Sequence, residues 1–466
     1  MLTYSFTDLG SDSLYEHLYK CIKQDILQGI LCANEKLPSK RTFAKNLGIS
    51  TITVENAYAQ LIAEGYIYSV PKKGFYVTDI QPPLESPKAK FILQETPQIP
   101  QKSACFADFT SNQTSSENFP FSIWSRLIRE QLNDNQSNLM INSPCGGILV
   151  LREAIAAHLM EFHGLCVSPE QIIIGAGTEY LYGLLIQLLG FDKRYAVEDP
   201  GYGKIAQIYQ SHNVSCSYIS MDHDGILIPD LEDQKVDIVH ISPSHHFPTG
   251  IVMPISRRYE LLGWASKSES RYIIEDDYDS EFRLSGQPIP TLQSIDILEK
   301  VIYMNTFTKS LSSTIRISYM VLPKHLVNAY YEKMRFYSCT VSNFEQYTLA
   351  AFIQQGYFEK HINRMRNYYR SKRDILLKCI QNSPLAEHAV ISEEDAGLHF
   401  LLKLQTHDSD EVFCQKAAQY GIRILPLSQY YIDSQKAERH VFIINYSSVE
   451  EAVMEEAIQK IWQILN

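Results

Sequence analysis

The sequence predicts a multidomain protein in which a small helical domain that ends in a β-hairpin precedes a larger α/β domain. The chain has 466 residues, of which 45% are hydrophobic, and this is more than one ordinary core accommodates. Helical hydrophobic patterns and a hairpin occupy residues 1–78, whereas short apolar runs alternate with helical patterns over residues 106–466. Residues 79–105 are rich in Pro, Lys and Gln and follow no period, which is typical of a linker.

Three helices and one hairpin are expected within residues 1–78. Apolar residues recur at helical spacing over residues 13–29 and indicate the first helix. Ser39 and Ser50 stand where they can cap two further helices, and a glycine follows each of these. A hairpin with the basic tip Pro71-Lys72-Lys73-Gly74 comes next. Two helices joined by a tight glycine turn and followed by a hairpin predict a winged helix-turn-helix.

The second helix of this pair begins with short polar side chains, and basic residues lie nearby. Such side chains can reach base edges in the major groove, while cations hold the phosphates. The alternative is that Ser50 only caps its helix and that the lysines are solvated surface charges. The polar candidates are Ser50, Thr51 and Thr53, and the basic candidates are Lys40, Arg41, Lys45, Lys72 and Lys73. We therefore expect double-stranded DNA as a partner of this domain.

The net charge of −11 is unevenly distributed along the chain. Residues 1–80 contain eight Lys or Arg and eight Asp or Glu, so the whole net charge lies in the remainder. An acidic body joined to a neutral segment with local basic clusters fits a DNA-binding module attached to a second domain.

From residue 106 onward, strands and helices alternate in the way that forms a mostly parallel sheet covered on both faces. The expected strands are 171–174, 194–197, 236–241, 271–274 and 301–304. A helical pattern from 326 to about 382, followed by strands at 397–404 and 441–446, indicates a smaller terminal subdomain. We therefore divide this part into a large subdomain, about 140–325, and a small subdomain, about 326–466.

Several residues that follow the expected strands match the needs of pyridoxal 5′-phosphate (PLP). This cofactor requires a lysine for its Schiff base, an anionic partner for its pyridine nitrogen and a hydrogen-bond donor near its 3′ oxygen. Lys309 stands among hydroxyl residues after one strand, and Asp276, Asp277 and Tyr278 end another. The alternatives, a solvated lysine and a solvated acidic loop, are ordinary for such residues taken singly. Their combination favours a PLP site.

The PLP phosphate requires hydroxyls and backbone N–H groups. A glycine-rich turn over residues 175–179 precedes a helical pattern, where N–H groups at a helix start bind phosphate. Tyr202, which follows a further strand, can stack on a ring. These positions complete a candidate cofactor pocket at the ends of several strands.

Neither a metal site nor a disulfide framework is expected. The nine cysteines are scattered, with an odd count and no CxxC pair. His245 and His246 are adjacent, so they point apart on an extended chain, and no acidic partner follows at ligand spacing. No apolar run approaches the roughly 18 residues that span a bilayer, and residues 1–10 lack a signal-peptide pattern. We expect a cytoplasmic protein without a membrane span.

Two sets of motifs resemble known families. Leu37-Pro38-Ser39-Lys40-Arg41 and the runs 47–54, 61–66 and 74–77 closely resemble the GntR family of winged-helix regulators, over residues 13–77. The runs at 142–147, 175–179, 198–202, 242–250, 275–279 and 305–316 stand in the order found in fold type I aminotransferases. Together they resemble the MocR/GabR family of bacterial transcription regulators, in which an aminotransferase-like PLP domain is fused behind a GntR-type winged helix. The resemblance covers nearly the whole chain.

For the N-terminal domain, the resemblance implies a role for each DNA-binding candidate. It places Arg41 on a phosphate, Ser50, Thr51 and Thr53 at the major groove, and the wing tip at Gly74 in the minor groove, with Lys72 and Lys73 beside it. Thr51 stands where many relatives have an arginine, so a bidentate guanine contact is lost and the base preference stays open.

For the second domain, the resemblance implies that Lys309 is the Schiff-base lysine, that Asp276 pairs with the pyridine nitrogen and that Tyr278 donates to the 3′ oxygen. Asp277 is the alternative to Asp276, because the register of the carboxylate run is uncertain by one residue. Tyr202 is expected to cover the ring. The phosphate cup or its rim comprises Gly177, Thr178, Thr306, Thr308 and Arg316, although Arg316 has the alternative role of binding a carboxylate of the effector.

The sequence departs from this family at the ligand position. Many aminotransferases have an arginine on a C-terminal strand that binds the substrate carboxylate, and Ile443 occupies that place here. Arg423 and Arg439 are the nearby substitutes, and Lys204 is a second candidate for an anion site.

The resemblance implies a homodimeric regulator that senses an amino compound. A working aminotransferase that carries a DNA-binding module is the alternative, since the lysine and the carboxylate for half-reactions are both present. A third possibility is a sensor whose only ligand is PLP. The intact winged helix and Ile443 favour regulation over turnover.

Overall fold

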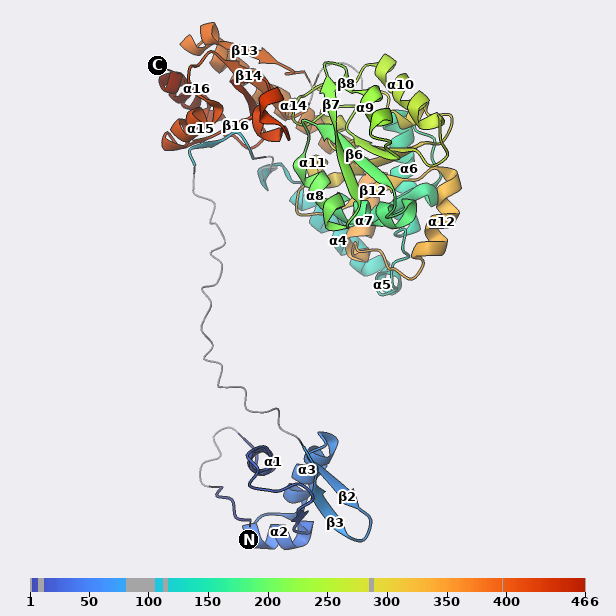
Figure 1. Ribbon diagram of the computed structural model, residues 1–466, viewed down its shortest axis with the longest axis vertical. Helices are drawn as coiled ribbons and strands as arrows, with labels where there is room; N and C mark the ends of the chain where they lie inside the picture. The colour runs from blue at the N-terminus through green and yellow to red at the C-terminus, as the bar shows by residue number, and fades with distance from the viewer. Residues whose placement is uncertain are drawn as a thin grey trace. The chain divides into compact units, whose positions relative to one another are not determined.

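The computed structural model describes residues 2–6, 12–80, 105–111, 116–284, 289–395 and 397–465. It divides into two compact units, Met1–Lys102 and Ser103–Asn466 (Figure 1). Residues 81–104, almost all of the expected linker, lie outside the described residues.

The N-terminal unit is a winged helix-turn-helix, as the sequence predicts. Its strands form one antiparallel sheet in the order β1-β3-β2. The two-residue strand β1 is an addition that the sequence pattern does not indicate, because it is too short to show alternation. The elements are α1 (Leu14–Leu27), β1 (Lys36–Leu37), α2 (Lys40–Leu47), α3 (Thr51–Ala63), β2 (Ile67–Val70) and β3 (Gly74–Val77).

Local capping groups define where α2 and α3 begin. The hydroxyl of Ser39 accepts a hydrogen bond from the Thr42 N–H at 3.2 Å, and that of Ser50 accepts one from the Thr53 N–H at 3.1 Å. Gly48 ends α2 in the left-handed conformation, with φ of 69°. The apolar faces of the three helices then meet in a core that includes Tyr58, whose hydroxyl donates to the Pro38 carbonyl at 3.0 Å.

The C-terminal unit is built on an eight-stranded sheet in the order β5-β12-β11-β10-β9-β6-β7-β8. The sheet is mostly parallel, as expected, but β12 runs antiparallel to β5 and β11, and β8 runs antiparallel to β7. The strands are β5 (Ile172–Gly175), β6 (Arg194–Asp199), β7 (Ser215–Asp222), β8 (Gly225–Ile226), β9 (Ile238–Ile241), β10 (Tyr272–Asp276), β11 (Val301–Thr306) and β12 (Ser318–Val321).

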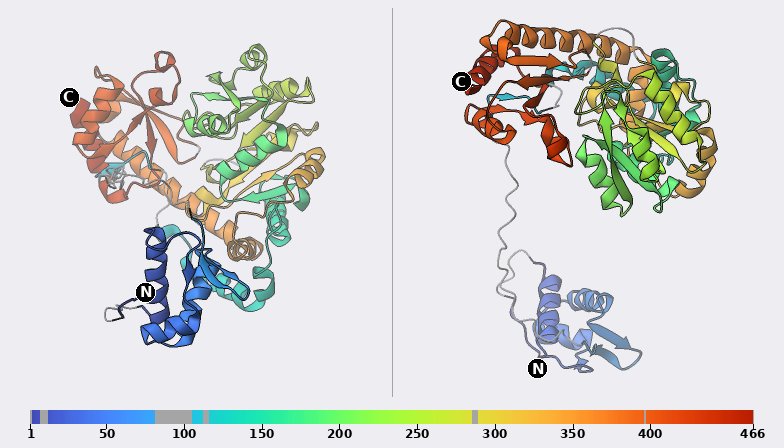
Figure 2. Two further views of the ribbon diagram at one scale, coloured as in Figure 1. Left: turned by 60° about the horizontal axis from the view of Figure 1, so that its bottom comes forward. Right: turned by 45° about the horizontal axis from the view of Figure 1, so that its top comes forward.

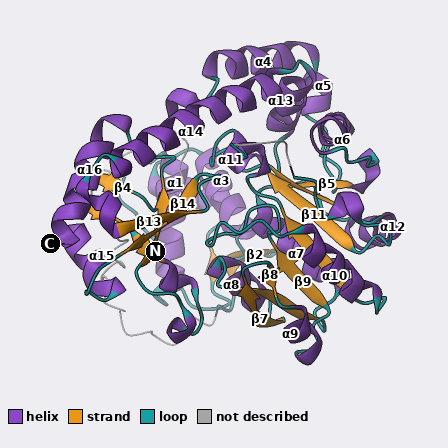
Figure 3. Ribbon diagram, turned by 90° about the horizontal axis from the view of Figure 1, so that it is seen from above, coloured by secondary structure: helices purple, strands orange, loops and turns teal. Residues whose placement is uncertain are grey.

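Helices cover both faces of this sheet, because alternate strand residues are buried on each side (Figure 3). On β11, for example, Tyr303 packs with α6 and α13, whereas Ile302 and Met304 pack with α7 and α12. The helices are α4 (Phe121–Asp134), α5 (Gln136–Leu139), α6 (Leu149–His163), α7 (Thr178–Leu189), α8 (Gly203–Ser211), α9 (Ile228–Asp233), α10 (Ile255–Ser266), α11 (Phe307–Ser310), α12 (Lys324–Met334) and α13 (Asn343–Gln354).

A four-stranded antiparallel sheet, β13-β14-β17-β16, forms the centre of a smaller subdomain. Its strands are β13 (Ala389–Ser392), β14 (His399–Leu404), β16 (Leu425–Pro426) and β17 (Val441–Asn445), and its helices are α14 (Tyr357–Gln381), α15 (Asp410–Gln419) and α16 (Glu451–Leu465). The first described strand of the C-terminal unit, β4 (Ala107–Asp108), also belongs to this subdomain, because it pairs with β15 (Ile422–Arg423).

The packing divides the two subdomains differently from the boundary at about residue 325 that the sequence predicts. Helices α12 and α13 pack in the cores of the large sheet. The long helix α14 passes from one subdomain to the other, since Phe358 and Ile362 belong to the large core and Tyr369 and Leu376 to the small one (Figure 2). A helical pattern shows that these helices exist but not which sheet they cover.

Two features are absent from the described residues. None of their helices is both long and apolar enough to cross a membrane. They also contain no group of three or more His, Cys, Asp or Glu side chains arranged to hold a metal ion.

Candidate cofactor site

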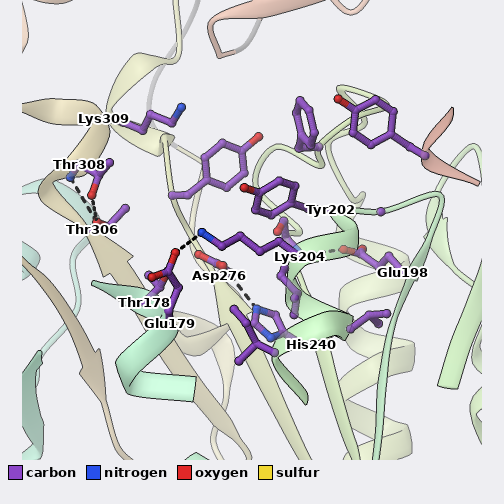
Figure 4. Close-up of a pocket in the computed structure, with 18 of the residues that line it drawn as sticks. Thr178, Glu179, Glu198, Tyr202, Lys204, His240, Asp276, Thr306, Thr308 and Lys309 are labelled. Atoms are coloured by element: carbon purple, nitrogen blue, oxygen red, sulfur yellow. Dashed lines mark hydrogen bonds and ion pairs between the residues drawn. The ribbon is translucent and has the colours of Figure 1, made fainter. Parts of the chain in front are cut away.

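A cavity of about 390 Å³ lies at the carboxyl ends of the central parallel strands. Asp276 and Thr306 end β10 and β11, and Thr178 begins the helix that follows β5. Parallel strands that end at one edge of a sheet bring such residues together although they are far apart in the chain. Of the nine predicted cofactor residues, all except Gly177 line the cavity (Figure 4). The eight are Thr178, Tyr202, Asp276, Tyr278, Thr306, Thr308, Lys309 and Arg316.

Asp276 presents an unpartnered oxygen in this cavity. Its Oδ2 accepts a hydrogen bond from the Tyr182 hydroxyl at 2.7 Å and lies 3.4 Å from Nε2 of His240. Its Oδ1 is buried and has no hydrogen-bond partner among the described residues. A buried carboxylate oxygen without a partner is costly, so this atom fits an N–H donor supplied by a ligand.

Asp277, the alternative in the carboxylate run, does not line the cavity. Its Oδ2 accepts hydrogen bonds from the hydroxyls of Tyr303 at 2.7 Å and Ser280 at 2.8 Å. Asp276 is the last residue of β10 and Asp277 follows it in the chain. Successive residues of an extended chain point to opposite sides, which explains why only Asp276 lines the cavity while Asp277 is buried away from it.

Lys309 lies in the short helix α11, directly after β11, and its side chain reaches into the cavity (Figure 4). Burial lowers the pKa of this lysine to about 8, although the nearby carboxylate of Asp279 acts in the opposite direction. No hydrogen bond or ion pair is found for its amino group among the described residues. A lysine with such a pKa has a substantial neutral, nucleophilic fraction near neutral pH.

Hydroxyls, a glycine turn and an arginine form the part of the cavity that suits an anion. Thr306 accepts from the Thr308 N–H at 3.2 Å and donates to the Thr308 hydroxyl at 2.8 Å. Gly177 precedes α7 with φ of 92°, and a Cβ at this position would lie 2.3 Å from Nη2 of Arg316. Only glycine therefore lets the arginine lie over the start of α7, where N–H groups favour phosphate.

Glu179, which the sequence did not single out, pairs with both cations at this rim. Its carboxylate lies 2.8 Å from Nη2 of Arg316 and also contacts the amino group of Lys204. The hydrogen bond from Lys204 is the first cause of its lowered pKa. Lys204, a candidate anion site, is thus ion-paired within the protein.

Two tyrosines complete the predicted set. The hydroxyl of Tyr278 lies 3.2 Å from Nδ1 of His245, and the same nitrogen lies 2.8 Å from Oδ2 of Asp279. Tyr202 is 51% exposed at the cavity, and its ring meets that of Phe247 edge to face at 5.9 Å. Tyr202 follows β6 and Tyr278 follows β10, and both side chains line the cavity, where they can contact the ring of a ligand.

Tyr182, His240 and Glu198 also line the cavity, and sequence reasoning did not assign them a role. Tyr182 lies one helical turn after Thr178, so its position on the same face of α7 was available as a signal. Glu198 accepts the Ser242 N–H at 3.0 Å, and burial raises its pKa to about 8. No local pattern reveals that such a carboxyl is buried.

Neither of the two nearby substitutes for the expected ligand arginine lines the cavity as the described residues form it. Ile443 lines it, whereas neither Arg423 nor Arg439 does. Arg423 is ion-paired with Asp108 at 2.9 Å, and Arg439 is exposed.

In the N-terminal unit, the first turn of α3 presents the predicted DNA-binding side chains. Thr51 is exposed, while the hydroxyls of Ser50 and Thr53 lie 2.8 Å apart as part of the cap. Ile52 is 68% exposed beside them, and an apolar side chain there suits a thymine methyl group. The sequence reasoning missed it because Ile52 reads as a core residue.

The basic candidates differ in their surroundings. Arg41 and Lys45 are exposed on α2, whereas Lys40 is ion-paired with Glu55 at 2.6 Å. Lys72 and Lys73 are exposed at the wing tip, where Lys72 and Gly74 both have positive φ. Lys40 and Arg41 are the first two residues of α2. Of these two, only Arg41 has no ion pair within the described residues.

Comparisons with known proteins agree with this architecture. Residues 107–461 match the aminotransferase class I and II family, and residues 14–77 match the gntR family of bacterial regulatory proteins. The chain is 38% identical to the uncharacterized HTH-type transcriptional regulator YdeL of Bacillus subtilis, over 97% of each chain. It is 28% identical to the probable rhizopine catabolism regulatory protein MocR of Rhizobium meliloti, over 96% of this chain and 93% of MocR.

Solved structures resemble the second unit in fold. An archaeal alanine:glyoxylate aminotransferase matches 77% of this chain and 90% of its own, with a TM-score of 0.68 and 23% identity. The two family matches and the full-length similarity to regulators with the same arrangement lead to one conclusion: the chain belongs to the MocR/GabR family of HTH-type transcription regulators, which join a GntR helix-turn-helix to an aminotransferase class I and II domain.

Proposed function

We propose that this protein is a PLP-dependent transcription regulator that acts in the cytoplasm as a homodimer. It binds double-stranded DNA through its winged helix and senses an amino compound, or PLP itself, in the aminotransferase-like domain. The observation that carries the proposal is the unpartnered Oδ1 of Asp276, which shares one cavity with the amino group of Lys309.

The residues of the cavity fit PLP. Asp276 would hold the pyridine nitrogen, Lys309 would attach the cofactor, and Tyr278 would donate to its 3′ oxygen. The turn at Gly177 with Thr178, Thr306, Thr308 and Arg316 would hold the phosphate, and Tyr202 would cover the ring. When bound, PLP supplies a carbonyl carbon that forms a reversible bond with amines.

Within this site, a hydrogen bond from a neighbouring tyrosine fixes the orientation of the Asp276 carboxylate. Tyr182 donates to one carboxylate oxygen and thereby orients the other toward the cavity. A carboxylate fixed in this way keeps a proton on a ring nitrogen in a water-poor pocket.

The regulator is favoured over a working aminotransferase by Ile443. An aminotransferase needs to hold its amino acid substrate firmly, and the cavity has an isoleucine where a carboxylate-binding arginine is expected. Turnover remains the second candidate, because Lys309 and Asp276 are both in the cavity. In the regulator, a ligand acts only if it favours one arrangement of the domains over another.

Exposed apolar side chains on the large subdomain support a dimer. Met140 is 75% exposed and Phe336 is 74% exposed. Met140 precedes Ile141, whose carbonyl accepts a hydrogen bond from the Asn343 side-chain amide at 2.6 Å, and Phe336 follows α12. Large exposed apolar side chains are candidates for interaction sites, and we assign these two to contact with a second copy of the chain.

The proposed function is tested by the visible absorption spectrum of the purified full-length protein. We expect a yellow protein whose band changes with one compound of a panel of amino acids, amines and PLP, and whose DNA affinity changes with the same compound. A band that decays to the pyridoxamine form would favour the enzyme instead. A colourless protein that takes up no PLP would overturn the cofactor assignment.

Replacing Arg41 with Ala should weaken DNA binding uniformly across sequences. It should also reduce the slope of the logarithm of the binding constant against the logarithm of the salt concentration by about one. The reason is that each phosphate contact releases a counterion. The measurement is a titration of labelled DNA at several salt concentrations. Lys20→Ala, which removes one charge from α1 where Lys20 pairs with Asp12, is the control. Equal slopes for Arg41→Ala and the unmodified protein would contradict the assigned contact.

A further inference from the structure

One wall of the cavity is apolar and aromatic. Leu425 of β16 and Ile443 of β17 are paired neighbours in the small sheet, and both line the cavity. Phe247 packs against the apolar cluster that contains Ile443, and its ring lies 5.2 Å from that of Tyr430 and 5.9 Å from that of Tyr202, both edge to face. This wall, formed by Tyr202, Phe247, Leu425, Tyr430 and Ile443, is called the apolar wall below.

Three basic side chains of the Lys or Arg type line the described cavity, namely Lys204, Lys309 and Arg316. Lys204 and Arg316 share the carboxylate of Glu179. Lys309 is committed to the cofactor by the proposed function. None of the three is left for a ligand carboxylate.

The remaining polar groups do not replace a cation. His240 contacts Asp276 through Nε2 and the Tyr209 hydroxyl through Nδ1, so both ring nitrogens are engaged. Asn445 offers an uncharged amide, and its Oδ1 already accepts from Ser447. Glu198 is a buried carboxyl whose pKa is raised to about 8 by burial, so near neutral pH it offers an uncharged group rather than a cation.

A ligand carboxylate placed against the apolar wall would lose its hydration without gaining a charged partner. Such a loss outweighs what an uncharged donor returns. Contact of an aliphatic or aromatic ligand body with the aromatic rings and branched side chains of the apolar wall, in contrast, lowers the free energy of binding.

We propose that the effector is a primary amine with an apolar or aromatic body and no carboxylate. Its amino group faces Lys309 and the cofactor, and its body lies on the apolar wall. This inference rests on the proposed function and goes beyond it, since it names the chemical class that the site accepts.

The test uses the PLP-loaded full-length protein and ligand pairs that differ by one carboxylate. The pairs are phenethylamine with phenylalanine, and 3-methylbutylamine with leucine. The half-saturating concentration is read from the change in the visible band, and the shift in melting temperature provides a second, independent readout. We expect each amine to bind at least about tenfold more tightly than its amino acid.

Substitution of Ile443 provides the matched variants. Ile443→Arg should reverse the order within each pair, because it supplies the missing cation, while Ile443→Leu should keep it. If Ile443→Arg does not fold, the ligand pairs on the unmodified protein still decide the question.

Amino acids that bind as tightly as their amines, or a PLP band that neither class changes, would overturn the inference and leave PLP binding intact. Absence of any PLP band would instead be the failure of the proposed function.

Discussion

The Lys309→Ala variant is expected to lose its visible cofactor band entirely and to release PLP on gel filtration. Lys309 is the lysine of the cavity without an ion-pair partner among the described residues, and burial lowers its pKa to about 8. Removal of its amino group leaves PLP with noncovalent contacts alone. The absorption spectrum before and after desalting measures this loss. DNA binding without effector should change little, because the winged helix belongs to a separate compact unit.

Lys204→Ala is the matched control for this experiment. Lys204 lines the same cavity but is about half exposed and bound to Glu179. We expect this variant to keep its band. Retention of the band in Lys309→Ala together with its loss in Lys204→Ala would show that the covalent lysine had been wrongly assigned.

Asp276→Asn should lower PLP affinity by roughly 10- to 100-fold, which corresponds to the loss of one charge-assisted hydrogen bond of about 1.5–3 kcal/mol. The side chain keeps its size, and the Tyr182 hydroxyl can still donate to it. What disappears is the negative charge beside the pyridine nitrogen. Titration of the protein freed of cofactor with PLP, followed through the visible band, gives the affinity.

Asp277→Asn distinguishes the two registers of the carboxylate run. Asp277 accepts hydrogen bonds from Tyr303 and Ser280 outside the cavity, and burial raises its pKa. Its replacement should change the melting temperature and leave PLP affinity within about twofold of the unmodified protein. A loss of affinity equal to that of Asp276→Asn would refute the assignment of the pyridine partner to Asp276.

Short-range patterns in the sequence predicted the elements that depend on neighbouring residues. Ser39 and Ser50 cap the helices that follow them, and Gly48 ends α2 in the left-handed conformation. Each of these contacts spans three to five residues, so composition and spacing contain the information. The apolar runs that predicted β10 and β11 are also short stretches of sequence. They place Asp276 at the end of one strand and Lys309 directly after the other.

The tertiary structure alone decided which of these side chains meet. It separated Asp276 from Asp277, brought Tyr182 and His240 to the first of them, and paired Glu179 with both Arg316 and Lys204. It also assigned α12 and α13 to the large sheet.

The sequence by itself thus determined the two-domain architecture, the helix caps and eight residues that line the cavity proposed for the cofactor. The pairing of partners 25 to 137 residues apart in the chain, the apolar wall and the helices that cover each sheet required the folded structure. The physical reason is that caps and turns depend on local backbone geometry. Burial, charge pairing and the lining of a cavity depend instead on which distant segments pack together, and no local pattern records that choice.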